Sequence, residues 1–116
     1  MASPRLAIAD LPAAVGTYLR AHADGDAASA AAVFTPQATV IDDGHTHRGA
    51  AAIAAWLTRS SSEYTYTTTF VGAEGELPGQ CTVTQQLDGD FPGSSVRLRY
   101  RFLLDGGLIS HLEIAP

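Results

Sequence analysis

The chain contains no lysine, and its seven arginines are outnumbered by twelve aspartates and glutamates. Charged residues of both signs make up only 16% of the 116 positions, and the formal net charge is −5. Nucleic acids and anionic membranes bind proteins through clustered basic side chains, which this composition does not supply. The sequence therefore argues against a general nucleic-acid-binding or membrane-binding function.

Cysteine and long apolar runs are also scarce. Cys81 is the only cysteine, so no disulfide can form within the chain, and a reducing compartment, the cytoplasm, is expected. Its neighbours include no group that would activate a thiol, so we interpret it as a small buried side chain. No stretch resembles a signal peptide or approaches the length of a membrane span. We expect one domain over residues 1–116, with a single core.

The front of the chain has the signals of an amphipathic helix. Asp10 precedes Leu11-Pro12, a cap followed by a proline near the first turn. Apolar residues then recur at helical spacing as far as His22, which places Tyr18 on the apolar face. At the end of this helix, a His22 cation would interact favourably with the helix dipole.

Two further helices and a short hairpin are expected before residue 60. Asp24-Gly25-Asp26 ends the first helix and caps a second one, which runs to Thr35-Pro36. A strand over 38–42 turns at Gly44 and returns over 45–49. A third helix over 50–59 then ends in a run of serines, and one face of it carries Ile53, Trp56 and Leu57.

The second half of the chain is typical of antiparallel strands joined by turns. The strand over 95–104 alternates, with Tyr100 and Phe102 on one face and arginines 97, 99 and 101 on the other. Asp105-Gly106-Gly107 is a hairpin signal, and connections are expected at 75–79 and around Phe91. The four predicted strands cover residues 64–74, 80–87, 95–104 and 108–115.

This order of elements resembles the nuclear transport factor 2-like superfamily. Segments 25–34, 38–42 and 49–56 are similar to its SnoaL-like and ketosteroid isomerase branches, and the pattern over 89–109 looks like many SnoaL-like proteins. The resemblance covers about residues 10–114. It implies an α+β fold, a cone-shaped α+β barrel with three N-terminal helices packed on a curved, mostly antiparallel sheet. Enzymes, ligand binders and assembly subunits all use this fold.

Within the ketosteroid isomerase branch, the resemblance implies catalytic residues. Tyr18 matches the tyrosine that donates to an enolate oxygen, and Asp42 matches the general base at the same spacing. The third position in that branch is a carboxylic acid kept protonated. Tyr100 is the inward-facing candidate for it here if the 105–107 turn is one residue shorter, and otherwise the position falls on Arg99. The side chains expected around the substrate are Val40, Trp56, Phe102 and Leu112.

Each of these residues also has a structural explanation. A tyrosine on an amphipathic helix usually packs in the core, and the same holds for Tyr100 in its strand. Asp42 can anchor the turn that follows it. His45 and His47 share a strand face and would need a third, unspecified ligand to bind a metal, so we expect exposed side chains and no metal. No phosphate-binding loop or dinucleotide fingerprint is present, and no cofactor is expected.

The sequence thus predicts a hydrophobic pocket for a small organic ligand, without nucleic-acid or membrane partners. The leading hypothesis is a cofactor-free isomerase or polyketide cyclase-like enzyme that moves a proton next to a carbonyl group. The alternative is a non-catalytic ligand-binding or accessory member of the fold. The outer arginine row, with Glu113 nearby, predicts a homodimer through the outer sheet face, and an ordinary solvated face is the other interpretation.

Overall fold

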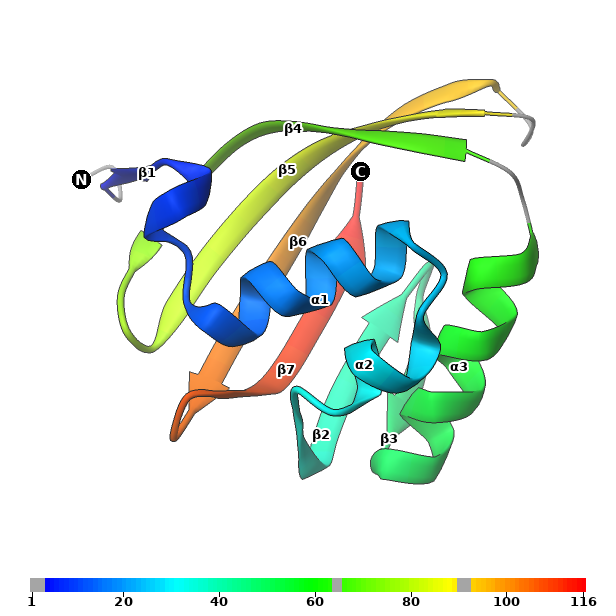
Figure 1. The fold of residues 1–116 in the computed structure, drawn as a ribbon, viewed down its shortest axis with the longest axis horizontal. Helices are drawn as coiled ribbons and strands as arrows, with labels where there is room; N and C mark the ends of the chain where they lie inside the picture. The colour runs from blue at the N-terminus through cyan, green and yellow to red at the C-terminus, as the bar shows by residue number, and fades with distance from the viewer. Residues whose placement is uncertain (1–3, 64–65, 90–92) are drawn as a thin grey trace.

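The computed structural model describes residues 4–63, 66–89 and 93–116, and in that part of the chain seven strands form one sheet. The sheet is curved, and the three α-helices lie on its concave side (Figure 1). The strand order is β1-β4-β5-β6-β7-β2-β3, and every neighbouring pair is antiparallel except β2 and β7. The expected α+β cone, with three helices on a mostly antiparallel sheet, is confirmed. The strands are β1 (Arg5–Leu6), β2 (Phe34–Asp42), β3 (His45–Arg48), β4 (Tyr66–Glu76), β5 (Gln80–Gly89), β6 (Ser95–Asp105) and β7 (Leu108–Ala115), and the helices are α1 (Ala13–Ala23), α2 (Ala27–Ala31) and α3 (Ala50–Glu63), with a 3₁₀ turn η1 (Ile8–Asp10).

Helix α2 is shorter than the sequence predicts. Asp26 caps it as expected, because its carboxylate accepts hydrogen bonds from the Ser29 backbone N–H at 3.1 Å and from the Ser29 hydroxyl at 2.7 Å. The helix ends at Ala31, however, and Phe34 already belongs to β2, where it pairs with Ile109. The backbone N–H of Ile109 donates to the Val33 carbonyl at 2.8 Å, so pairing with a distant strand outweighs the local preference of an alanine-rich segment for helix.

Helix α3 is longer than predicted, because serine does not end it. It continues through 60–62 to Glu63 instead of ending at residue 59. The hydroxyls of Thr58 and Ser60 donate to the carbonyls of Ala54 and Leu57, at 3.0 and 3.3 Å. Hydroxyl groups that bond back to the preceding turn are compatible with a continuing helix.

The turn residues set the register of two hairpins. Asp43 and Gly44 have positive φ angles of 52° and 75°, as a two-residue turn requires, and Asp42 pairs with His45 across it. Gly106 and Gly107 play the same part between β6 and β7. The predicted turn at 75–79 is shorter in the structure, because β4 extends to Glu76. The residues expected at the start of β4 (64–65) and the connection around Phe91 lie outside the described residues.

The N-terminal segment contributes elements that sequence patterns did not predict. The two residues of β1 pair with Ala73 and Glu74 of β4. The prediction that Asp10 caps α1 is wrong, because the Asp10 carboxylate accepts a hydrogen bond from the Ala7 N–H at 2.9 Å and closes η1 instead. The N-cap position of α1 is Pro12 instead.

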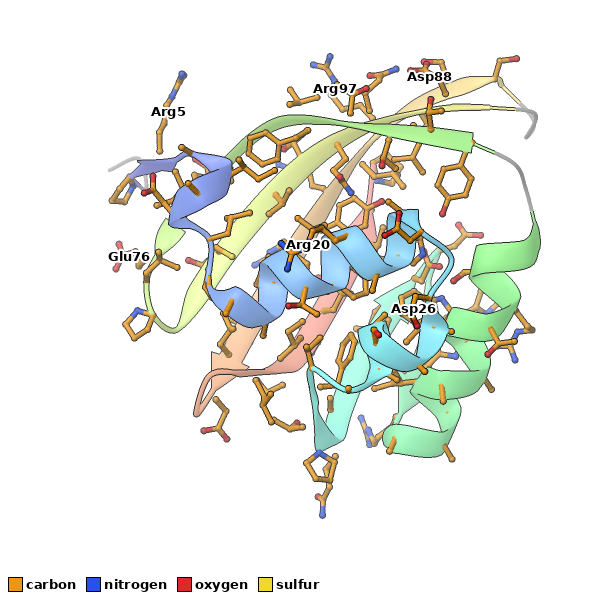
Figure 2. The ribbon with its side chains drawn as sticks, in the orientation of Figure 1. Arg5, Arg20, Asp26, Glu76, Asp88 and Arg97 are labelled. Carbon is orange, nitrogen blue, oxygen red and sulfur yellow. The ribbon has the colours of Figure 1, made fainter. Side chains whose placement is uncertain are left out.

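The inner and outer faces of the sheet differ as the alternation in β6 predicts. Tyr100 and Phe102 are buried, whereas the arginines of β6 are exposed. Figure 2 shows Arg97 on the outer side of the sheet, away from the helices. Arg101 forms an ion pair with Glu113 at 3.6 Å.

Cys81 is buried and unpaired, and burial raises the pKa of its thiol to about 11. No helix in the described part of the chain is long and apolar enough to cross a membrane.

Candidate functional site

A hydrogen bond between α3 and the end of β2 defines the candidate site. Trp56 Nε1 donates to Asp42 Oδ2 at 2.9 Å. Trp56 is almost fully buried, and the ring of His47 stacks on it with centroids 5.8 Å apart. His47 lies opposite Val40 in the β2–β3 ladder, so it shares the face of the hairpin that α3 covers. The buried indole therefore holds the half-buried Asp42 carboxylate in one orientation.

A cleft of about 510 Å³ opens beside this carboxylate. Its lining combines polar residues of the β2–β3 hairpin with the second half of α3. His45 is exposed, as expected, whereas His47 is half-buried against Trp56. Among the described residues, no group of three histidine, cysteine or acidic side chains is arranged to hold a metal ion. The lining residues are Asp42, Asp43, His45, Thr46, His47, Trp56, Arg59 and Ser60.

Tyr18 lies deeper in the molecule and has no exposed surface. Its ring meets Phe34 and Phe102 edge-on, at centroid distances of 5.8 and 5.7 Å. Its hydroxyl is the one buried side-chain N or O atom in the described residues without a hydrogen-bond partner. Burial raises the pKa of Tyr18 well above its ordinary value, and the nearby Tyr100 and Asp42 raise it further. The phenol is therefore a protonated donor that no described protein group satisfies.

Tyr100 is the second buried phenol. Burial raises the pKa of Tyr100, and a side-chain hydrogen bond with Gln85 offsets part of this rise. Gln85 is itself buried and belongs to β5, the strand next to β6 in the sheet. The charge of Asp42 raises the pKa of both Tyr18 and Tyr100, but neither phenol lines the cleft beside Asp42.

The other expected pocket residues belong to the core. Val40, Phe102 and Leu112 have no exposed surface, and they pack in the same buried cluster as Tyr18. Among the four, only Trp56 lines the cleft beside Asp42. A role for the other three as walls of a ligand pocket stays a prediction.

Sequence reasoning did not predict that His22 contacts both Tyr18 and Tyr66. His22 is half-buried and stacks on Tyr18 at 5.6 Å, and its Nδ1 lies 3.4 Å from Tyr66 Oη. Burial lowers the pKa of His22, and Asp42 raises it to a lesser degree, so the expected cation at the helix end is disfavoured. The spacing of four residues between Tyr18 and His22, which puts both on one helix face, was the available signal.

Comparison with known proteins identifies relatives of this fold. The family model of the SnoaL-like domain matches residues 15–111. A protein of Sinorhizobium meliloti, provisionally assigned as a polyketide cyclase, is 31% identical over 95% of this chain and 100% of its own, with a TM-score of 0.87. Among curated proteins, none matches the sequence. The family resemblance drawn from the sequence is confirmed.

Two more distant structures share the fold. A Catenulispora acidiphila protein with a ketosteroid isomerase-like fold, in complex with trimethylamine, is 18% identical over 91% of this chain and 86% of its own (TM-score 0.79). A Mycobacterium tuberculosis protein in complex with estradiol-17beta-hemisuccinate is 16% identical over 89% of this chain and 90% of its own (TM-score 0.74). At these identities, the likeness shows the fold alone.

Proposed function

Because the chain belongs to the SnoaL-like domain family, we propose that it binds a small carbonyl compound and moves a proton next to the carbonyl group. The reaction class is an isomerisation or an aldol-type cyclisation that needs no cofactor. The observation that carries this proposal is a carboxylate held by an indole near a buried, unpartnered phenol. Buried polar groups normally have partners, and one without a partner is typical of a site that a ligand completes.

Asp42 is the general base of the proposal. Its Oδ2 accepts from Trp56, and the other carboxylate oxygen, Oδ1, takes the proton from the carbon next to the carbonyl. Because the indole is buried, it keeps the carboxylate aimed while the substrate enters from the cleft. Trp56 is thus a positioning residue as well as a wall.

Tyr18 and Tyr100 are the donors to the oxygen that becomes negative. When Asp42 takes the proton, the electron pair of the C–H bond moves onto the carbonyl oxygen and forms an enolate. Both phenols stay protonated, because burial raises their pKa, and each can donate a hydrogen bond to that oxygen. In an isomerisation, a conjugated enolate takes the proton back from Asp42 at another carbon, and the carbonyl group re-forms. In an aldol-type cyclisation, the enolate carbon attacks a second carbonyl group of the same substrate, and the alkoxide that forms takes the proton from Asp42.

The relatives support the class of ligand. The Sinorhizobium meliloti protein, which is similar over its whole length, is provisionally assigned as a polyketide cyclase. The Mycobacterium tuberculosis structure is a complex with a steroid half-ester, estradiol-17beta-hemisuccinate. We propose a ligand of the same general kind, mostly apolar with at least one carbonyl oxygen.

Binding of β-naphthol, an apolar molecule with one enolate-like oxygen, tests the proposal. Asp42→Asn should bind it about tenfold more tightly than wild type, because the ligand oxygen no longer lies near a negative carboxylate. Asp43→Asn is the matched control. It neutralises the next carboxylate in the same cleft at a positive-φ position that asparagine tolerates, and the affinity should not change. Equal effects of the two variants, or no binding to folded wild type, would contradict the proposal.

A non-catalytic role, as a ligand-binding or accessory member of the fold, is the second candidate. The complete burial of Val40, Phe102 and Leu112 favours a non-catalytic role, because side chains packed in the core present no surface to a substrate. The free energy of unfolding separates the two candidates. Asp42→Asn should raise it if the carboxylate is kept for chemistry, and should lower it if Asp42 serves as a structural anchor.

Assembly and compartment form a separate part of the proposal. We propose a homodimer through the outer sheet face, where Arg97 and Arg99 lie beside the exposed Leu103. Arg99→Glu should then shift the protein toward a monomer in analytical ultracentrifugation, and an unchanged sedimentation coefficient would contradict the interface.

The single buried cysteine suits a reducing compartment, and we propose the cytoplasm.

A further inference from the structure

The cleft beside Asp42 contains an imidazole that has no part in the chemistry above. His45 is the first residue of β3, and it pairs directly with Asp42, the last residue of β2, across the two-residue turn. Side chains of directly opposed residues in an antiparallel pair point to the same face, with Cβ atoms about 5 Å apart. Both residues line the cleft of about 510 Å³. The hairpin therefore places an imidazole next to the proposed base.

The environments on the two sides of the Asp42 carboxylate differ. From α3, the buried Trp56 donates to Oδ2 at 2.9 Å. From β3, His45 is exposed, so its ring can turn toward the carboxylate or toward the solvent. His47, the other histidine of the cleft, lies opposite Val40, is half-buried and stacks on Trp56. His45 is thus the histidine that borders both the carboxylate and the solvent.

We propose that His45 carries the proton of Asp42 to and from the solvent while the enolate is bound. The inference rests on the proposed function, because it takes Asp42 to be the base. His45 acts through Asp42 and does not touch the reacting carbon.

The proton follows the same path in both directions. Asp42 Oδ1 takes the proton from carbon, and the carboxylate becomes a neutral carboxyl group. A neutral imidazole accepts that proton, directly or through one water molecule, and becomes an imidazolium, which restores the carboxylate. The imidazolium then gives the proton to the solvent. In the reverse direction, a solvent proton passes from His45 to Asp42 and from there to the enolate carbon.

A relay is needed because a bound ligand leaves the Asp42 carboxylate little contact with the solvent. The side chain is half-buried, and Oδ2 accepts from the indole of Trp56. The other oxygen, Oδ1, faces the ligand in the proposed complex. Without a relay, the proton on Asp42 returns to the substrate more often than it exchanges with water. His45 therefore determines how much of the abstracted hydrogen is lost to the solvent in each cycle.

The test is the rate of deuterium incorporation from D₂O into β-tetralone, an apolar ketone with acidic α-hydrogens. In His45→Ala, this rate should fall about a hundredfold, the lower end of the effect of a positioned acid–base group. The affinity of His45→Ala for β-naphthol should stay close to that of wild type, because the relay does not bind the ligand oxygen. His111→Ala is the matched control, since this histidine lies on β7 outside the cleft, and it should incorporate deuterium at the wild-type rate.

Chemical rescue distinguishes a proton relay from a merely structural role. Added imidazole can enter the space that the alanine leaves in the cleft and accept the proton from Asp42, so it should restore incorporation in His45→Ala. Pyrazole, a ring of the same size that is far less basic, should not restore it. Imidazole should also have no effect on Asp42→Asn, which lacks the base.

The outcomes separate this inference from the proposed function. If His45→Ala incorporates deuterium at the wild-type rate while Asp42→Asn does not, the inference is wrong and the proposed function stands. The same conclusion follows if imidazole does no more than pyrazole for His45→Ala. If folded wild type incorporates no deuterium above the buffer rate, the proposed function fails, and this inference fails with it.

Discussion

Removal of the Tyr18 hydroxyl should make the protein more stable and less able to bind its ligand. In Tyr18→Phe, the ring contacts with His22, Phe34 and Phe102 remain, and only the oxygen atom is lost. That oxygen has no exposed surface and no hydrogen-bond partner in the described part of the chain. The substitution therefore takes away a desolvated polar group and breaks no bond.

The size of the effect follows from the cost of a buried, unsatisfied polar group, which is about 1–3 kcal/mol. The space left by one oxygen atom is smaller than a methyl group, so its cost stays below about 1 kcal/mol. We expect the free energy of unfolding to rise by about 1 kcal/mol, which corresponds to a rise in Tm of roughly 4 °C for a domain of this size.

Chemical denaturation measures this change, and Tyr100→Phe is the matched control. The same single oxygen is lost there, but Tyr100 shares a hydrogen bond with the buried Gln85. Tyr100→Phe should therefore lower the free energy of unfolding by about 1–2 kcal/mol, because a buried amide loses its partner. In parallel, Tyr18→Phe should weaken binding of β-naphthol, since the ligand oxygen loses a donor.

Opposite signs for the two variants are the critical feature. If Tyr18→Phe destabilises the protein as much as Tyr100→Phe does, the hydroxyl of Tyr18 has a protein partner in solution. The reasoning that makes it a donor kept for a ligand would then be refuted.

Three other predictions concern the supports of the site and the core. Trp56→Phe keeps an aromatic ring beside His47 but removes the hydrogen-bond donor to Asp42. The kcat for a substrate should therefore fall about tenfold, and an unchanged kcat would count against the positioning role of Trp56. Gly75→Ala should lower the free energy of unfolding by about 2 kcal/mol in urea, because a Cβ there would collide with the backbone of Gln80 and Cys81, whereas Gly72→Ala in the same strand meets nothing and should change it little. Burial holds the Cys81 thiol protonated, so the stability it contributes should be present below its ordinary pKa of 9.0 and be lost as the pH rises toward about 11, and Cys81→Ala should lack this loss in a pH series of thermal melts.

Local sequence patterns predicted those parts of the fold that local physics determines. The alternation in β6 separated Tyr100 from the exposed arginines, and the Asp105–Gly107 signal marked the last hairpin. The patterns failed where distant pairing decides the structure. An alanine-rich segment is helical by propensity, but Phe34 extends as a strand because Ile109, far along the chain, supplies its backbone partner.

The residues of the candidate site could likewise be predicted from the sequence, but the contacts between them could not. The family resemblance drew attention to Tyr18 and Asp42, and Trp56 was expected only as a wall. Its bond to Asp42 depends on how α3 packs across the β2–β3 hairpin, which residue spacing alone does not specify. The contact between His22 and Tyr66 joins residues 44 positions apart, so no motif could indicate it.

The measurement that tests the central claim most directly is hydrogen–deuterium exchange at the α-carbon of a bound ketone. β-Tetralone in D₂O is a suitable probe, because it is apolar and its α-protons are acidic enough to follow by NMR. If Asp42 is a base that faces a carbonyl held by Tyr18, wild type should accelerate deuterium incorporation above the buffer rate, and Asp42→Asn should not. Equal rates with the folded wild-type protein and the folded variant would contradict the assignment of Asp42 as the base.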